Sequence, residues 1–317
     1  MVLQHVTITE TRPEGLGNQA LRLEPTGGEL QPFEAGAHVD VHLPNGLVRQ
    51  YSIASAPHRR DHYLLCVKHE AQSRGGSQYV CEALQVGTEL RISAPRNLFP
   101  LHAGETQVLV GAGIGLTPLL AMAESLECDG RPFVLHHYSR AREQVPFLER
   151  LLRGFSHGRV YLHHSRDGAS PRQHIPREIS APPPGGQLYL CGPEAFMQRF
   201  GELALEHGWA AASVHREAFG GTLAEPPAEG DEAFEVLLAS SGRLIRVEAD
   251  RSIAAALLEA GVDVPLSCEM GICGACTVEV LEGTPEHRDS VLSEQERTGH
   301  MTLCCSRSRS ARLTLNL

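Results

Sequence analysis

The sequence has no apolar stretch long enough to cross a lipid bilayer and no excess of positive charge. Of its 317 residues, 38 are Asp or Glu and 28 are Lys or Arg, which gives a formal net charge of −10 with histidine neutral. This balance argues against binding to nucleic acid or to an anionic membrane surface. The N-terminal segment MVLQHVTITE lacks the apolar core of a signal peptide. We therefore expect a cytoplasmic protein that binds neither nucleic acid nor membrane, with a monomer as the default state.

A disulfide framework is not indicated either, because nine cysteines are an odd number. Cys268, Cys273 and Cys276 follow the spacing C-x4-C-x2-C, and Cys304 lies 28 positions after Cys276. This is the plant-type ferredoxin spacing for a [2Fe–2S] cluster. Zinc is the alternative, but zinc knuckles usually have two close cysteine pairs and only one such pair is present. Spacing alone leaves the fourth ligand open between Cys304 and Cys305.

The chain divides into parts with different sequence patterns. Residues 1–102 alternate short apolar runs with Gly and Pro, which indicates an antiparallel β-barrel. Residues 103–222 alternate apolar runs with helical stretches, the βαβ pattern of a parallel sheet. Residues 223–230 have the composition of a linker. Residues 231–317 predict a small β-rich domain with one helix, capped by Ser252 and ended by Gly261. The fold class is therefore multidomain α+β.

Two glycine motifs follow predicted strands of the middle part. The segment Gly111–Pro118 contains Thr117, which we expect to be the N-cap of the next helix, with Pro118 as its first residue. Such a turn brings backbone N–H groups close to a phosphate, although a tight turn alone also requires glycine. No acid stands at the tip of the next strand (Tyr138–Arg140), so a standard Rossmann site is not indicated. The second motif is Cys191-Gly192-Pro193, placed where a parallel sheet binds ligands.

The many histidines raise the question of a metal site. His136-His137 and His163-His164 are adjacent pairs in predicted strands. Neighbouring side chains of a strand point to opposite faces, so neither pair is suited to chelation. We expect these histidines to be packed or solvated.

A flavin site is indicated by two further segments. Arg49–Ser52 closes a barrel strand, and Arg74–Ser77 begins a predicted helix that could hold a phosphate. By themselves these residues also fit surface loops. Together with five other segments, they make essentially the whole chain resemble the phthalate dioxygenase reductase family, which includes the vanillate demethylase reductases. Those segments are Pro95–Pro100, Gly111–Pro118, Cys191–Pro193, His287–Asp289 and Cys304–Arg307, beside the cysteine loop itself.

The resemblance implies a flavin-binding barrel, a nicotinamide-nucleotide domain and a β-grasp-like [2Fe–2S] ferredoxin domain, in that order. It implies FMN rather than FAD, and Cys304 rather than Cys305 as the fourth ligand. NADH is the expected donor, and NADPH is the alternative because Ser and Arg at strand tips can hold a 2′-phosphate. The residues implied to contact the flavin are Arg49, Gln50, Tyr51, Ser52, Val67, Lys68, Arg74, Gly75, Gly76, Ser77 and Phe219. Those implied to face the nucleotide are Gly113, Ile114, Thr117, Ser139, Arg140, Cys191, Gly192 and Pro193.

The function implied is that of a reductase component. A hydride from NAD(P)H would reach FMN, and single electrons would pass through the cluster to the Rieske centre of a separate terminal oxygenase. We expect Ser52, Thr117 and Cys191 near the reacting atoms. The chain has neither a Rieske signature nor the histidine and carboxylate motif of mononuclear iron, so it is not the oxygenase itself. The alternatives are a self-sufficient flavin reductase acting on a small acceptor and a non-catalytic electron carrier or redox sensor.

Overall fold

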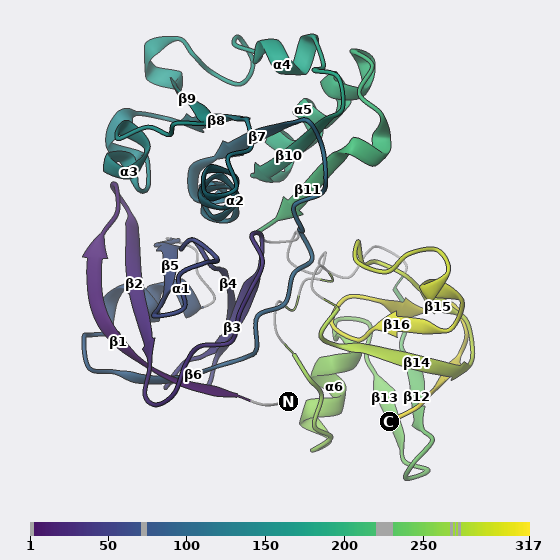
Figure 1. The fold of residues 1–317 in the computed structure, drawn as a ribbon. Helices are drawn as coiled ribbons and strands as arrows, with labels where there is room; N and C mark the ends of the chain where they lie inside the picture. The colour runs from purple at the N-terminus through teal and green to yellow at the C-terminus, as the bar shows by residue number, and fades with distance from the viewer. Residues whose placement is uncertain (1–2, 71–74, 220–230, 267–268, 270, 272–273) are drawn as a thin grey trace. The chain divides into compact units, whose positions relative to one another are not determined.

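The computed structural model describes residues 3–70, 75–219, 231–266, 269, 271 and 274–317. The chain divides into two compact units, Met1–Phe219 and Gly220–Leu317, and each contains its own apolar core (Figure 1). The predictions for Arg74, the linker 223–230, Cys268 and Cys273 lie outside the described residues. Within the described ranges, no helix is both long enough and apolar enough to traverse a bilayer.

The first part of unit Met1–Phe219 is a six-stranded antiparallel sheet in the order β4-β3-β6-β1-β2-β5. Val6 and Ile8 of β1 are fully buried while Thr7 between them is less so, the alternation that places one strand face in a core. Just beyond β4, the Ala54 N–H donates to the carbonyl of Leu64 on β5 at 2.8 Å, so the two edge strands meet and the sheet curls into the predicted barrel. The elements are β1 (Gln4–Pro13), β2 (Asn18–Pro25), β3 (His38–His42), β4 (Val48–Ser52), β5 (Tyr63–Lys68), α1 (Gly76–Glu82) and β6 (Glu89–Ile92).

A five-stranded parallel sheet in the order β11-β10-β7-β8-β9 forms the rest of this unit. Val108, Leu109 and Val110 of β7 are all fully buried, as expected of a strand covered on both faces. The chain runs outward from β7 through β8 and β9, then crosses back to β10, so the strand order reverses between β7 and β10. The elements are β7 (Thr106–Ala112), η1 (Gly113–Gly115), α2 (Leu116–Cys128), β8 (Phe133–Ser139), η2 (Arg142–Gln144), α3 (Leu148–Leu152), β9 (Gly158–His164), η3 (Ser165–Asp167), α4 (Arg177–Ser180), β10 (Gly186–Gly192), α5 (Glu194–Glu206), η4 (Ala211–Ser213) and β11 (Val214–Ala218).

The barrel and the parallel sheet share an apolar core. Ala54 and Phe99 of the barrel part lie in one buried cluster with Leu116 and Leu120 of α2 and with Leu109 of β7. Helix α5 and Trp209 cover the opposite face of the sheet in a separate cluster. Burial of this shared surface stabilises the two parts as one unit, which fixes strand β4 of the barrel relative to the carboxyl edge of the parallel sheet.

The second unit has a five-stranded mixed sheet, β13-β12-β18-β14-β16, and a short pair, β15-β17. Helix α6 begins at Ser252, whose Oγ accepts the Ala255 N–H at 3.1 Å, and it ends before Gly261, which has a φ of 73°. Both caps were predicted, and a sheet with one covering helix is the expected ferredoxin-type fold. The elements are β12 (Phe234–Leu238), β13 (Leu244–Val247), α6 (Ile253–Glu259), β14 (Thr277–Glu282), β15 (Pro285–Glu286), η5 (Glu296–Thr298), β16 (His300–Thr302), β17 (Arg307–Ser308) and β18 (Arg312–Leu315).

Candidate redox site

The two glycine motifs of the parallel sheet meet where its strand order reverses. A Cβ added to Gly115 would lie 2.3 Å from the backbone oxygen of Cys191, so only glycine allows η1 to approach the end of β10 this closely. His137 lies with Nε2 3.0 Å from the Gly113 carbonyl oxygen, and complete burial lowers the pKa of His137 to about 4. A neutral, packed histidine therefore fixes the turn at the carboxyl edge of the sheet, where parallel sheets bind ligands.

Thr117 has a different local role from the one predicted. Helix α2 begins at Leu116, with Gly115 rather than Thr117 in the N-cap position, because the turn η1 runs directly into the helix. Thr117 is buried, and its Oγ1 donates to the carbonyl of Ile114 at 3.0 Å. The hydroxyl proton of Thr117 thus takes part in a hydrogen bond inside the turn, and the residue stiffens the turn Gly113–Gly115.

A buried carboxyl group links the barrel to the carboxyl edge of the parallel sheet. Glu217 of β11 stands beside Cys191 of β10 in register, and the Ser52 hydroxyl at the end of β4 donates a hydrogen bond to Glu217. Burial raises the pKa of Glu217 to about 8, against the opposing effect of the Ser52 hydrogen bond, and Oε2 of Glu217 has no partner in the described structure. Burial also raises the pKa of the Cys191 thiol, and the Glu217 carboxylate adds to this.

Two of the three expected reaction-site residues, Ser52 and Cys191, are therefore joined through a residue that the sequence interpretation left out. Glu217 lies two positions before Phe219, the residue of this segment that was expected to contact the flavin. The available signal was an ionisable residue within a strand beside that aromatic residue. Perturbed pKa values of this kind often mark functional groups.

Strand β4 separates the four residues predicted to contact the flavin into two pairs. Arg49 and Tyr51 lie opposite the core valines of β3, whereas Gln50 and Ser52 lie on the other face. The Arg49 side chain crosses the start of α1, because a Cβ on Gly76 would lie 2.5 Å from its Nε. The amide of Gln50 instead reaches Asp40 at 3.4 Å. Strand β4 thus places the guanidinium of Arg49 near the start of α1 and the hydroxyl of Ser52 against Glu217.

The remaining residues predicted to contact the flavin or the nucleotide differ in their exposure and in their hydrogen-bond partners. Phe219 at the end of the first unit is 40% exposed, which leaves its ring available for stacking. The Ser139 hydroxyl is engaged by His164 Nδ1 at 2.8 Å, while Arg140 is exposed. The other predicted residues lie as follows: Val67 is buried at the end of β5, Lys68 pairs with Glu70, Gly75 has a φ of 84°, Ser77 Oγ accepts the Glu70 N–H, Ile114 lies in η1, and Gly192 and Pro193 connect β10 to α5.

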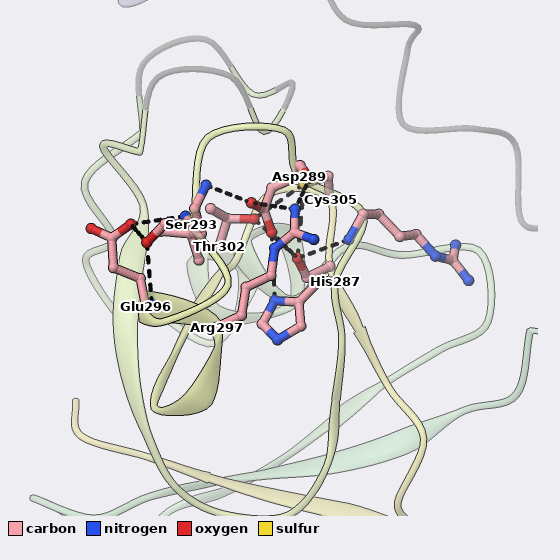
Figure 2. Close-up of polar contacts among 10 residues, drawn as sticks. His287, Asp289, Ser293, Glu296, Arg297, Thr302 and Cys305 are labelled. Atoms are coloured by element: carbon pink, nitrogen blue, oxygen red, sulfur yellow. Dashed lines mark hydrogen bonds and ion pairs between the residues drawn. The ribbon is translucent and has the colours of Figure 1, made fainter. Parts of the chain in front are cut away.

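In the second unit, the described part of the cysteine loop brings sulfurs and backbone together. Hydrogen bonding with the Cys276 thiol raises the pKa of the buried Cys304 thiol, so these two sulfurs are neighbours. The Gly271 N–H points at Cys304 Sγ over 3.2 Å. The Cys305 thiol hydrogen-bonds with Cys304 and also contacts the Thr302 hydroxyl at 3.2 Å (Figure 2), and no backbone N–H to its sulfur is seen among the described residues. This arrangement suits an iron–sulfur cluster, in which backbone N–H groups donate to the ligand sulfurs, and it favours Cys304 as the fourth ligand.

The comparisons with known proteins agree with this geometry. Residues 236–309 match the 2Fe-2S iron-sulfur cluster binding domain family. The vanillate O-demethylase oxidoreductase of Pseudomonas sp. (strain HR199 / DSM 7063) is 42% identical over 295 residues, 92% of each protein. The phthalate dioxygenase reductase structure, described as modular for electron transfer from pyridine nucleotides to [2Fe-2S], aligns with a TM-score of 0.76 at 34% identity, covering 99% of this chain and 98% of that one.

A further solved structure contains the same set of domains within a longer chain. An intact type IV self-sufficient cytochrome P450 monooxygenase aligns with a TM-score of 0.84 at 35% identity, over 100% of this chain and 41% of that one. The near-complete coverage in the shorter relatives includes the barrel, the parallel sheet and the cluster domain together. The chain belongs to the phthalate dioxygenase reductase family, the iron–sulfur flavoprotein oxidoreductases that serve as reductase components of oxygenase systems.

Proposed function

We propose that this chain oxidises NADH, holds FMN in its barrel and passes single electrons through its [2Fe–2S] cluster to the Rieske centre of a separate terminal oxygenase. The observation that carries the proposal is the contact of Glu217 with both Ser52 and Cys191. It joins β4, the strand expected to contact the flavin, to the end of β10, where the nucleotide is expected to bind. When bound, FMN would take the two electrons of a hydride and release them singly, as the cluster requires.

The described residues supply binding and orientation for this reaction. Arg49 lies in β4 and its side chain reaches the start of α1, where it would bind the FMN phosphate together with Gly75, Gly76 and Ser77. The turn Gly113–Gly115 offers backbone N–H groups to the pyrophosphate of the dinucleotide, and the ring of Phe219 is available to cover the flavin. The Ser52 hydroxyl is held in one orientation by Glu217, so it would present a fixed dipole to the flavin edge.

A haem protein is a second candidate acceptor. The aligned self-sufficient P450 carries a module of this fold in the same chain as its monooxygenase, which shows that such a module is compatible with a haem partner. The vanillate and phthalate relatives favour an aromatic-ring oxygenase system. Electron transfer to a purified Rieske oxygenase, compared with transfer to a P450 lacking its own reductase, distinguishes the two acceptors.

An anaerobic titration of the purified protein with NADH tests the whole proposal. FMN takes two electrons and the cluster one, so bleaching of both the flavin and the iron–sulfur absorption bands should need about one and a half NADH per protein. Bleaching of a flavin in a protein without iron–sulfur bands would contradict the electron path and leave direct flavin chemistry. The same titration with NADPH, in wild type and in Arg140→Asp, tests whether Arg140 binds the 2′-phosphate of NADPH.

A further inference from the structure

The segment that begins with Asp289 lies directly against the cysteine loop. The Ser290 N–H donates to the Gly271 carbonyl at 3.0 Å, and a Cβ on Gly271 would lie 3.0 Å from Asp289 Cα and 2.4 Å from Cys305 Sγ. Gly271, with a φ of 72°, is therefore held by this segment, and its own N–H points at Cys304 Sγ. Interactions that hold Asp289 and Ser290 in place therefore also hold the hydrogen bond from the Gly271 N–H to Cys304, a predicted cluster ligand.

The Asp289 side chain is a fully buried carboxylate. Its Oδ2 accepts the Leu292 N–H at 2.9 Å, and its Oδ1 lies 3.5 Å from both Ser306 Oγ and His287 Nδ1. Nη2 of Arg297 lies 3.5 Å from Oδ2 and donates to the backbone oxygen of Asp289 at 2.6 Å (Figure 2). A buried charge is costly unless it is paired, so Arg297 compensates the carboxylate and ties down its backbone at once.

Arg297 follows a local turn that two hydrogen bonds close. The Ser293 Oγ accepts the Glu296 N–H at 3.3 Å, and Glu296 Oε2 accepts the Ser293 N–H at 2.9 Å, so the chain is held where it enters η5 (Figure 2). On the other side of the carboxylate, Thr302 Oγ1 lies 3.0 Å from Ser306 Oγ and 3.2 Å from Cys305 Sγ. A continuous polar network therefore runs from η5 through Asp289 to the residue next to Cys304.

We propose that Asp289 and Arg297 are positioning residues for the [2Fe–2S] cluster, which fix the Gly271 N–H on the Cys304 sulfur and set the reduction potential of the cluster through their opposite charges. This inference rests on the proposed function, because it requires a bound cluster. Reduction adds one negative charge to the cluster. A neighbouring cation stabilises the reduced state and a neighbouring carboxylate destabilises it, and inside a protein such interactions are weakly screened.

The test is a mediated redox titration of the full-length holoprotein, followed by the EPR signal of the reduced cluster. Arg297→Gln should make the equilibrium constant for cluster reduction about tenfold smaller, which is about 59 mV toward negative potential for one electron. Asp289→Asn should shift the potential in the opposite direction, and Arg297→Lys should restore a potential near that of wild type. Arg246→Gln is the matched control, because it removes an arginine of the same unit from an exposed pair with Glu248.

The outcomes separate this inference from the proposed function. A loaded cluster with an unchanged potential in Arg297→Gln, or an equal shift in Arg246→Gln, overturns the role of the pair and leaves the proposed function intact. A wild-type protein that binds flavin but no cluster overturns both. If Asp289→Asn does not fold, the difference in cluster potential between Arg297→Gln and Arg297→Lys still tests the inference. Loss of the cluster from Arg297→Gln but not from Arg297→Lys also supports charge-dependent positioning.

Discussion

At the scale of single residues, Glu217 is a carboxyl group buried at the end of the parallel sheet. Its pKa is raised from 4.5 to about 8 by complete burial, and it lies against Ser52 and Cys191. Between these two pH values the folded state retains a proton that the unfolded state releases. Stability must therefore fall as pH rises from about 4.5 to about 8. A carboxyl group kept protonated near neutral pH can donate a hydrogen bond to a neighbouring acceptor.

We predict that Glu217→Gln removes this pH dependence. The free energy of unfolding of the variant should exceed that of wild type increasingly as pH rises above about 5, since each pKa unit corresponds to about 1.4 kcal/mol. Urea unfolding at pH 5, 6, 7 and 8 measures the difference. Glu206→Gln, at the exposed end of α5, is the control and should parallel wild type. Equal pH slopes for wild type and Glu217→Gln would show that the carboxyl group is not buried in solution.

Gly115 supports a second prediction at this scale. In Gly115→Ala the new methyl group would meet the backbone of Cys191, so the turn must move away from the end of β10. A misplacement of about 1 Å at such a position costs on the order of 10²-fold in catalysis. We expect kcat/KM for NADH with ferricyanide as acceptor to fall by about that factor. Gly27→Ala, where the added atom meets nothing, should be unaffected.

At the scale of elements, the sequence predicted best where one short pattern decides the outcome. The N-cap Ser252 and the terminator Gly261 of α6 follow from local hydrogen bonding and backbone freedom, and the structure confirms both. The start of α2 was misplaced, because three glycines allowed a 3-10 turn in front of Thr117 that propensity alone does not reveal. The pairing of Glu217 with Ser52 joins segments 165 positions apart in sequence, so no local pattern contains it.

Strands β8 and β9 carry a buried histidine pair with a testable consequence. His136 Nδ1 and His163 Nε2 lie 3.0 Å apart, His136 Nε2 is 3.1 Å from Glu178, and His163 stacks on Tyr138. Burial lowers the pKa of His163 to about 3 and also lowers that of His136. The folded state thus keeps His163 neutral while the unfolded state binds a proton below about pH 6.5, so stability is lost as pH falls from 6.5 toward 3.

We therefore expect His163→Gln to weaken the acid sensitivity of the first unit. At neutral pH the variant should be destabilised by about 1–3 kcal/mol, because packing and the bond to His136 are lost. The difference in Tm between wild type and the variant should then shrink as pH falls from 7 to 5, because only wild type loses the His163 contribution. Thermal unfolding followed by circular dichroism measures both effects, with the exposed His58→Gln as control. The same change of Tm with pH in His163→Gln and in wild type would contradict the buried neutral pair.

At the scale of the whole molecule, the order of the three folds was predictable because each part of the chain has its own sequence pattern. Alternation indicated the barrel, apolar runs separated by helices indicated the parallel sheet, and the cysteine spacing indicated the cluster domain. The core shared by Ala54, Phe99 and Leu120 was not predictable, since it depends on which surfaces meet after folding. That core makes the barrel and the parallel sheet one unit, while the 2Fe-2S domain lies in the other unit of the chain.

This division predicts that the two halves of the electron path can be separated by one substitution. Cys304→Ser removes a sulfur that the Gly271 N–H and Cys276 both contact, so we expect the variant to lose the cluster. Reduction of cytochrome c should then fall by at least about 10²-fold. NADH oxidation with ferricyanide as acceptor should stay within about twofold of wild type, because it needs only the first unit. Cys305→Ser should keep both activities, because Cys305 packs against Thr302 and the hydroxyl of serine can make the same contact. Iron and sulfide analysis beside the two assays identifies the ligand: an iron-free Cys305→Ser with a loaded Cys304→Ser would reverse the assignment.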